Sequence, residues 1–135
     1  MEAMQTATEN TDSKKTILCV DDDDIALDVW SQMIQKLGYT VLQARYGYEA
    51  LKIFEKNKNR ISLVILDMRM PGMDGCEVYD RLKAIQQEIK IIIVSGYIDQ
   101  YSINELLKRK FGDYIEKPFK LKKLSEKIEE VLEQP

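Results

Sequence analysis

The 135-residue sequence is 44% hydrophobic and 32% charged, which predicts one compact domain with a hydrophobic core of its own. A net charge of −3 provides no positive field for nucleic acid or an anionic membrane, and no apolar run approaches the ~20 residues of a membrane span. We therefore expect neither direct nucleic-acid binding nor a membrane segment. The absence of histidine excludes Ser-His-Asp catalysis, histidine-ligated metals and a phosphohistidine donor.

The first 14 residues are polar and nearly devoid of large apolar side chains, which predicts a disordered leader or an interdomain linker. The domain is therefore expected at residues 15–133. Cys19 lies inside an apolar run and Cys76 stands alone, so we expect no disulfide framework. A reducing, cytoplasmic location fits this cysteine usage.

Five short apolar or β-branched runs follow the leader, each bounded by polar or turn residues. The third and fourth runs (LVIL and IIIV) are nearly continuous, as in strands buried on both faces, whereas the fifth is shorter and more polar, as in an edge strand. The expected strands are Thr16–Val20, Thr40–Ala44, Leu63–Leu66, Lys90–Val94 and Asp113–Ile115.

Between and after these runs, apolar residues recur at the spacings of three and four that predict amphipathic helices, and Gly38 provides a stop for the first helix. The marker residues are Ala26, Val29, Trp30, Met33 and Leu37 in the first helix; Ala50, Leu51 and Phe54 in the second; Val78, Leu82 and Ile85 in the third; Ile103, Leu106 and Leu107 in the fourth; and Leu121, Leu124, Ile128, Val131 and Leu132 in the fifth.

Strict alternation of five strands with five helices predicts an α/β fold in which a parallel sheet is covered by helices on both faces. Units of this length and number favour a flavodoxin-like, doubly wound (βα)5 sandwich of three layers. We therefore expect a five-stranded parallel sheet in the order 2-1-3-4-5.

Polar side chains stand at the carboxyl ends of four of the expected strands. Asp21 and Asp22 follow the first strand, Asp67 ends the third, Ser95 ends the fourth, and Lys117 follows the fifth. In the order 2-1-3-4-5 these strands are consecutive neighbours, about 4.8 Å apart, and ligands of doubly wound sheets bind at this edge. The sequence thus predicts one crevice shared by carboxylates, a hydroxyl and an ammonium.

The electrostatics of this acidic cluster restrict what it binds. Two carboxylates about 4 Å apart repel by about 4 kcal/mol at an effective dielectric of 20, so Asp21, Asp22 and Asp67 need a cation, a proton or both. Oxygen ligands alone favour a hard ion, Mg²⁺ above Ca²⁺. The central Asp67 is then suited to accept a phosphoryl group as an acyl phosphate, while Lys117 and Ser95 bind phosphoryl oxygens.

Simpler interpretations exist for each residue taken alone. Asp23 or Asp24 is best explained as the N-cap of the first helix, and for Asp21 and Asp22 a cap and a metal ligand remain equally open. An isolated lysine such as Lys117 is usually a solvated surface residue. The coincidence of complementary groups at four neighbouring strand ends is what favours a site.

Four stretches at these strand ends, taken together, resemble the receiver domains of two-component response regulators of the chemotaxis-Y type. The stretches are ILCVDDDD (17–24), LVILDMRMPGMDG (63–75), IIIVSGY (91–97) and DYIEKPF (113–119). The resemblance runs from about Lys15 to Leu132. It implies a phosphoacceptor, not a conventional enzyme, that takes a phosphoryl group onto Asp67 from a histidine kinase or phosphotransfer protein.

The resemblance also implies how the metal is held. Asp22 would ligate Mg²⁺ directly, Asp21 directly or through water, and Asp67 and the main-chain carbonyl of Arg69 would complete the protein ligands. The Met70–Gly75 loop, with its turn signal and an Asp74 that can cap the third helix, would hold the Arg69 backbone near the metal.

The remaining matched positions imply a switch. Ser95 would move toward the phosphoryl group, Tyr114 would turn inward behind it, and the face made by the fourth helix, fifth strand and fifth helix would then signal to a downstream protein partner. The bond between Lys117 and Pro118 is expected to be a cis peptide. Arg69 and Tyr97, beside the site, are expected to tune the lifetime of the phosphorylated state.

Gly96 departs from the family pattern, in which alanine or another small residue is more common, and it is expected to keep the site accessible. No output domain is expected, so the chain is interpreted either as a stand-alone response regulator or as the C-terminal receiver of a hybrid sensor kinase. The sequence does not identify the kinase, the signal, the partner or the oligomeric state.

Three other function classes fit the sequence less well. A haloacid-dehalogenase-type phosphatase needs an acidic residue two positions after its nucleophile, where Arg69 stands here. A flavodoxin-like cofactor binder needs a Ser/Thr/Gly-rich loop where this chain has four aspartates. A degenerate receiver that acts only as a scaffold requires a blocked site.

Overall fold

The computed structural model describes residues 15–134 except 71, 97–99 and 110–112, and it leaves the side chains of 100–103 undescribed as well. The predicted leader and Tyr97 therefore lie outside the described residues. Strands and helices alternate along the chain in the order β1 (Thr16–Val20), α2 (Asp24–Lys36), β2 (Thr40–Ala44), α3 (Gly47–Asn57), β3 (Ile61–Asp67), α4 (Gly75–Ile85), β4 (Lys90–Ser95), α5 (Gln100–Lys108), β5 (Tyr114–Glu116) and α6 (Leu121–Leu132).

The five strands form one parallel sheet in the order β2-β1-β3-β4-β5, which confirms the predicted topology. β3 is longer than predicted because the backbone pairs past the polar Ser62, with Ile61 opposite Thr16. At its other end β3 includes Asp67, which pairs with Val94 of β4. The carboxyl ends of β1, β3, β4 and β5 consequently meet at one edge of the sheet.

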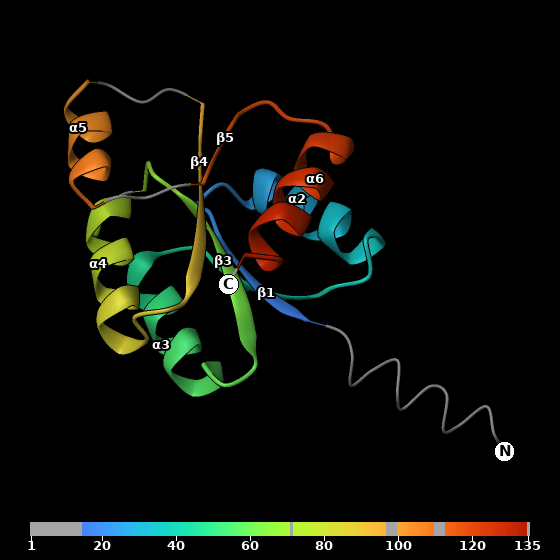
Figure 1. Ribbon diagram of the computed structural model, residues 1–135, viewed down its shortest axis with the longest axis horizontal. Coiled ribbons are helices and arrows are strands. Elements are labelled where there is room, and N and C mark those ends of the chain that lie inside the picture. The colour runs from blue at the N-terminus through green and yellow to red at the C-terminus, as the bar shows by residue number, and fades with distance from the viewer. Residues whose placement is uncertain (1–14, 71, 97–99, 110–112, 135) are drawn as a thin grey trace, which may run out of the picture.

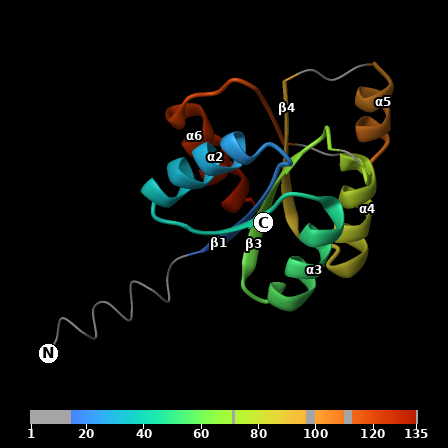
Figure 2. The same ribbon diagram turned by 180° about the vertical axis from the view of Figure 1, so that it is seen from behind.

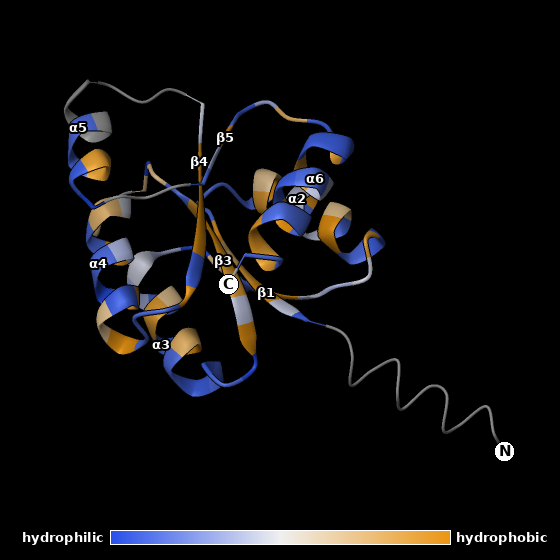
Figure 3. Ribbon diagram, in the orientation of Figure 1, coloured by the Kyte–Doolittle hydropathy of each residue, from blue (hydrophilic) through white to orange (hydrophobic). Residues whose placement is uncertain are grey.

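Helices cover both faces of the sheet, as Figures 1 and 2 show from opposite sides. Helices α2 and α6 lie on one face, and α3, α4 and α5 lie on the other. Strands β1, β3 and β4 are hydrophobic along most of their length, whereas the outer sides of the helices are largely hydrophilic (Figure 3). Among the described residues, no helix combines the length and the hydropathy of a membrane span.

The buried face of α2 differs from the prediction. Val29 is 45% exposed, and the residues that face the sheet are Leu27, Trp30, Ser31 and Ile34. The marker Val29 was wrong, whereas Trp30 is buried and Met33 and Leu37 pack against the same cluster. Because α2 offers apolar residues on more than one side, packing against α6 and the sheet selects the side with Leu27 and Ile34.

In α5 the marker Leu106 is fully buried, but its neighbour Leu107 is 60% exposed, so this second marker was also assigned to the wrong side. Leu121, the first marker of α6, is 37% exposed at the start of that helix. The inner face of α6 is formed by Leu124, Ile128 and Val131, as the spacing predicts.

Helix ends follow local chemistry. Asp23 is the N-cap of α2, and its carboxylate accepts hydrogen bonds from the backbone N–H groups of Ile25 and Ala26 at 3.0 and 3.2 Å. Asp74 caps α4 in the same way, with the Glu77 N–H at 3.0 Å. Gly38, just beyond α2, has a φ of +101°, a left-handed conformation that favours glycine.

Candidate functional site

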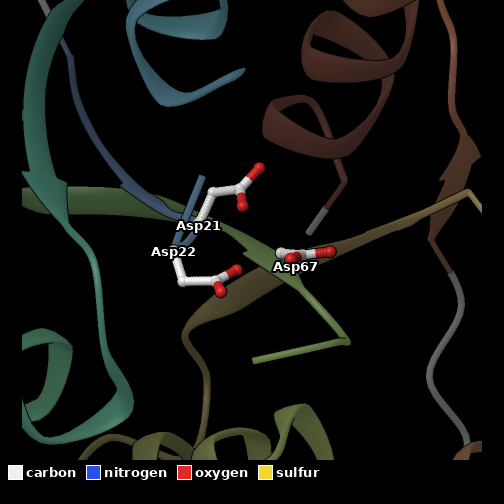
Figure 4. A group of neighbouring side chains, drawn as sticks. All are labelled: Asp21, Asp22 and Asp67. Carbon is white, nitrogen blue, oxygen red and sulfur yellow. The ribbon is translucent and has the colours of Figure 1, made fainter. Parts of the chain in front are cut away.

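Three carboxylates converge at the carboxyl edge of the sheet. Asp21 and Asp22 follow β1 and Asp67 ends β3, and Figure 4 shows the three side chains grouped around the same space. One oxygen from each of them lies within 4.8 Å of the others. Asp21 is 1% exposed and Asp67 is 5% exposed, whereas Asp22 is less covered, so the cluster is a buried acidic pocket that is open on the Asp22 side.

Lys117 supplies a positive charge to this pocket. Its Nζ lies 3.1 Å from Asp21 Oδ2 and 3.7 Å from Asp67 Oδ1. The residue follows β5, where its backbone N–H donates to the carbonyl oxygen of Ser95 at 2.9 Å and its bond to Pro118 is a cis peptide. A single ammonium beside three carboxylates leaves excess negative charge when all three are ionised, so the pocket is suited to a further cation.

The environment of Asp67 opposes its ionisation. Burial, followed by the negative charge of Asp21, raises the pKa of Asp67 to about 7 from an ordinary value of 3.8. The Lys117 charge and the backbone N–H of Arg69, which donates to this carboxylate, act in the opposite direction. Asp67 thus becomes an ionised carboxylate at neutral pH most readily when additional positive charge enters the pocket.

The predicted switch residues lie on β4, which adjoins β3, and on β5, the next strand of the sheet. Ser95 is fully buried at the end of β4, one residue beyond Val94, the partner of Asp67 in the sheet. Tyr114 begins β5, is half-buried, and packs against the hydrophobic cluster that contains Leu106 of α5. Desolvation by burial raises the pKa of Tyr114.

The segment after Asp67 is held close to the start of α4. The Gly75 N–H donates to the carbonyl oxygen of Met68 at 3.3 Å, and a Cβ added at Gly75 would lie 2.8 Å from the Met68 Cα. Gly75 is therefore needed for a close backbone approach, a role that the turn signals alone did not reveal. The Arg69 side chain is exposed at this segment.

The structure thus brings together the predicted Asp21, Asp22, Asp67 and Lys117, and it places Ser95 on the adjoining strand end. Gly96 is exposed, and a Cβ added there would meet the Lys117 Cβ at an ordinary 3.8 Å. A small side chain at this position would consequently leave the pocket unchanged.

Trp30 lies beside the site, although its helical spacing predicts only a core position. Trp30 of α2 is 4% exposed, and the centre of its indole ring lies 4.9 Å from Lys117 Nζ. Helical spacing correctly predicts that Trp30 is buried but says nothing of a lysine on a distant strand. The presence of a large aromatic ring near the first strand end was the only available signal.

Comparison with known proteins places this geometry in a family. Residues 17–129 match the response regulator receiver domain family. The chain is 39% identical over 119 residues to the sensor kinase CckA of Brucella abortus, a match that covers 87% of this chain but 12% of that protein. It is 34% identical over 116 residues to sporulation initiation phosphotransferase F of Bacillus subtilis, covering 86% of this chain and 92% of that protein.

Solved structures agree. The response regulator protein TrrA of Thermotoga maritima, crystallised in complex with Mg²⁺ and BeF, superposes with a TM-score of 0.77 at 32% identity, covering 87% of this chain and 98% of that one. The sheet order, the acidic edge and these matches lead to one conclusion: the chain belongs to the response regulator receiver domain family, the phosphoacceptor domains of two-component signalling.

Proposed function

We propose that Asp67 of this receiver domain accepts a phosphoryl group from the phosphohistidine of a histidine kinase or phosphotransfer protein, in the presence of Mg²⁺. The observation that carries the proposal is the buried Asp67 carboxylate, which is flanked by Asp21, Asp22 and the Lys117 ammonium at one edge of the sheet. The domain itself is proposed to act as a signalling phosphoacceptor in the cytoplasm and not as a conventional enzyme.

The transfer is a displacement at phosphorus. A carboxylate oxygen of Asp67 forms the new bond to phosphorus while the bond from phosphorus to the donor imidazole nitrogen breaks, and the electron pair of that bond leaves with the imidazole. Such a step needs positioning and charge stabilisation more than proton transfer. Lys117, 3.7 Å from Asp67, is placed to bind a phosphoryl oxygen as a point charge, and the Ser95 hydroxyl to donate to another.

The donor set fits Mg²⁺. Three carboxylates provide hard oxygen atoms within 4.8 Å of one another, with a charge that Lys117 offsets only in part. Asp21, Asp22 and Asp67 would hold the ion, and the Arg69 carbonyl is proposed as a further ligand. When bound, the ion supplies positive charge that reduces the repulsion between the carboxylates and an incoming phosphoryl group. Crystallisation of the similar TrrA with Mg²⁺ and BeF supports this assignment.

Signalling is proposed to follow from the new charge. A phosphoryl group adds nearly two negative charges at one end of the sheet, which would draw Ser95 toward it. Tyr114, half-buried on the neighbouring strand, would then turn inward and change the face formed by α5, β5 and α6. That face is the proposed surface for a downstream protein partner.

The setting of the domain is proposed in two forms. Residues 15–133 act as the receiver either by themselves, like the phosphotransferase that the chain covers to 92%, or within a hybrid sensor kinase, like CckA, of which it covers 12%. Both forms receive phosphate from a histidine kinase or phosphotransfer protein.

Labelling with a small phosphodonor tests the acceptor. The protein is incubated with acetyl phosphate and Mg²⁺, and intact mass with peptide mapping then measures acyl phosphate. We expect Mg²⁺-dependent labelling of the wild type, loss of labelling in Asp67→Asn, and retention in Asp23→Asn, because Asp23 only caps α2. Labelling that persists in Asp67→Asn would refute the acceptor, and an unlabelled wild type would favour a scaffold that only binds partners.

A further inference from the structure

The Lys117 ammonium has a third neighbour besides its two carboxylates. The centre of the Trp30 indole ring lies 4.9 Å from Nζ, within the range of a cation–π interaction. Trp30 is 4% exposed and projects from α2, whereas Lys117 follows β5. The contact therefore links two elements that are distant in the sequence at the point where the phosphoryl group is proposed to bind.

Trp30 is itself held in place. Its ring packs against the ring of Phe119 at a centroid distance of 5.9 Å, with the planes inclined by 43°. Phe119 lies two residues beyond Lys117, so the connection from β5 to α6 supplies both the ammonium and the ring that supports its aromatic neighbour. Trp30 also belongs to the buried cluster between the sheet and α6, where a shift of the ring would disturb close packing.

The lysine needs such a restraint. Its side chain is a flexible four-carbon stem, 27% exposed, and its charge is attracted by Asp21 at 3.1 Å and by Asp67 at 3.7 Å. Two carboxylates attract the ammonium but leave its direction of approach free, and a partly exposed lysine can also extend into water. An aromatic face favours the cation at one location and costs no extra negative charge in an already acidic pocket.

We propose that Trp30 is a positioning residue that holds the Lys117 ammonium beside Asp67 ready for phosphoryl transfer. This inference rests on the proposed function of the site and adds to it a residue that touches neither the phosphoryl group nor the metal. The indole reduces the number of orientations that Lys117 samples, so less ordering is needed when the phosphoryl group arrives.

Replacements of Trp30 separate positioning from packing. Trp30→Phe keeps an aromatic face, whereas Trp30→Leu keeps apolar bulk without one. Phe54→Leu is the matched control, because Phe54 is a fully buried ring in the cluster on the other face of the sheet. We expect Trp30→Leu to slow Mg²⁺-dependent labelling by acetyl phosphate about tenfold, the equivalent of about 1.4 kcal/mol in the barrier. Trp30→Phe and Phe54→Leu should stay within about threefold of the wild type.

A double-mutant cycle with Lys117→Met identifies the route of the effect. If Trp30 acts through the ammonium, Trp30→Leu slows labelling in the wild-type background but changes it little in Lys117→Met. Equal effects in the two backgrounds would show that the ring acts through packing, and a normal rate in Trp30→Leu would show that it is not needed. Either result overturns the proposal.

Nuclear magnetic resonance provides a readout that does not depend on phosphorylation. The Lys117 methylene protons next to Nζ should be shifted upfield by the indole ring current and show restricted motion, and Trp30→Leu should remove both signs. Unshifted, mobile Lys117 signals in the wild type would overturn the positioning role even if labelling is normal. An unlabelled wild type with restrained Lys117 signals would instead reject the proposed function alone.

Discussion

At the scale of single residues, the pocket contains buried carboxylates whose mutual repulsion is unfavourable until a cation binds. Asp67 is buried next to Asp21, and both the burial and this neighbour favour its neutral form. Lys117 compensates one of the negative charges, at 3.1 Å from Asp21 and 3.7 Å from Asp67. The repulsion in this acidic pocket therefore lowers the stability of the metal-free protein and favours the binding of a cation.

This cost predicts a pH dependence of stability. The pKa of Asp67 is about 7 in the folded protein and 3.8 ordinarily, so the folded state binds more protons between these values and its stability falls as pH rises through them. The lost free energy of unfolding amounts to at most roughly 4 kcal/mol, at 1.36 kcal/mol per pKa unit.

In urea unfolding without Mg²⁺, Asp67→Asn should therefore be more stable than the wild type at pH 8, and the two should converge near pH 4. Asp23→Asn serves as the control, since Asp23 is exposed and caps α2. A wild type that is as stable at pH 8 as Asp67→Asn would contradict the raised pKa.

At the scale of single elements, two contacts hold the helices on the α3–α4–α5 face. The start of α4 abuts the segment after Asp67 through Gly75, and the end of α5 is tied to α4 through Arg109. The first contact involves the segment that directly follows Asp67, and the second involves α5, which belongs to the face that the proposed switch changes. For each contact, we expect its removal or distortion to lower the stability of the protein more than a matched control substitution does.

Gly75→Ala should destabilise the protein, because the added Cβ would lie 2.8 Å from the Met68 Cα and backbone must shift to admit it. We expect a loss of about 1–3 kcal/mol in the free energy of unfolding, together with slower labelling, since the displaced segment follows Asp67 directly. Gly96→Ala is the control, with its nearest contact at 3.8 Å and an expected change below about 0.5 kcal/mol. Equal stability of the two variants would exclude a tight approach at Gly75.

Arg109→Ala should loosen α5 from α4. The guanidinium donates to both carboxylate oxygens of Asp80 at 2.7 and 2.8 Å and to the Glu105 carbonyl oxygen at 2.7 Å. We expect the free energy of unfolding, measured in urea, to fall by about 1 kcal/mol, and we expect this difference from the wild type to be smaller at high salt. Arg81→Ala breaks an exposed pair within α4 and should cost below about 0.5 kcal/mol. If both variants lose the same amount, Arg109 makes no special tie between the helices.

At the scale of the whole molecule, the pocket depends on several elements that only the complete fold brings together. The pocket needs the ends of β1 and β3, the connection after β5 and the helix α2 in one place, so a ligand of the pocket stabilises all of them together. Helices on both faces leave the carboxyl edge as the place where these elements meet (Figure 1).

Mg²⁺ should accordingly raise the stability of the whole domain. Binding to the folded state alone adds about 2.7 kcal/mol to the free energy of unfolding at a concentration 100 times the dissociation constant. Thermal unfolding should shift upward with Mg²⁺ in the wild type and in Asp23→Asn, and much less in Asp22→Asn. The sole tryptophan, Trp30, lies near the pocket and offers a fluorescence signal for the same titration. An equal shift of the unfolding temperature in Asp22→Asn would show that Asp22 is not a ligand of the ion.

Much of the fold could be predicted because its signals are local. The apolar runs predicted β1 and β2 at their observed bounds, alternation predicted the parallel sheet, and the Asp23 and Asp74 caps followed from residue type. The prediction of which side of α2 packs inward was partly wrong, since Val29 and Leu27 are both apolar and only contact with the sheet and α6 distinguishes them.

The sequence by itself determined which groups stand at the strand ends, and the predicted strand order 2-1-3-4-5 then implied that Asp21, Asp22, Asp67 and Lys117 converge. Only the tertiary structure decided how these groups share charge and which ring lies against Lys117. Burial, the pKa of Asp67 and the Trp30 contact depend on distances between separate elements. Such distances result from the packing of the whole core, whereas the spacing of residues along the chain shows only which side chains share one face of a single helix or strand.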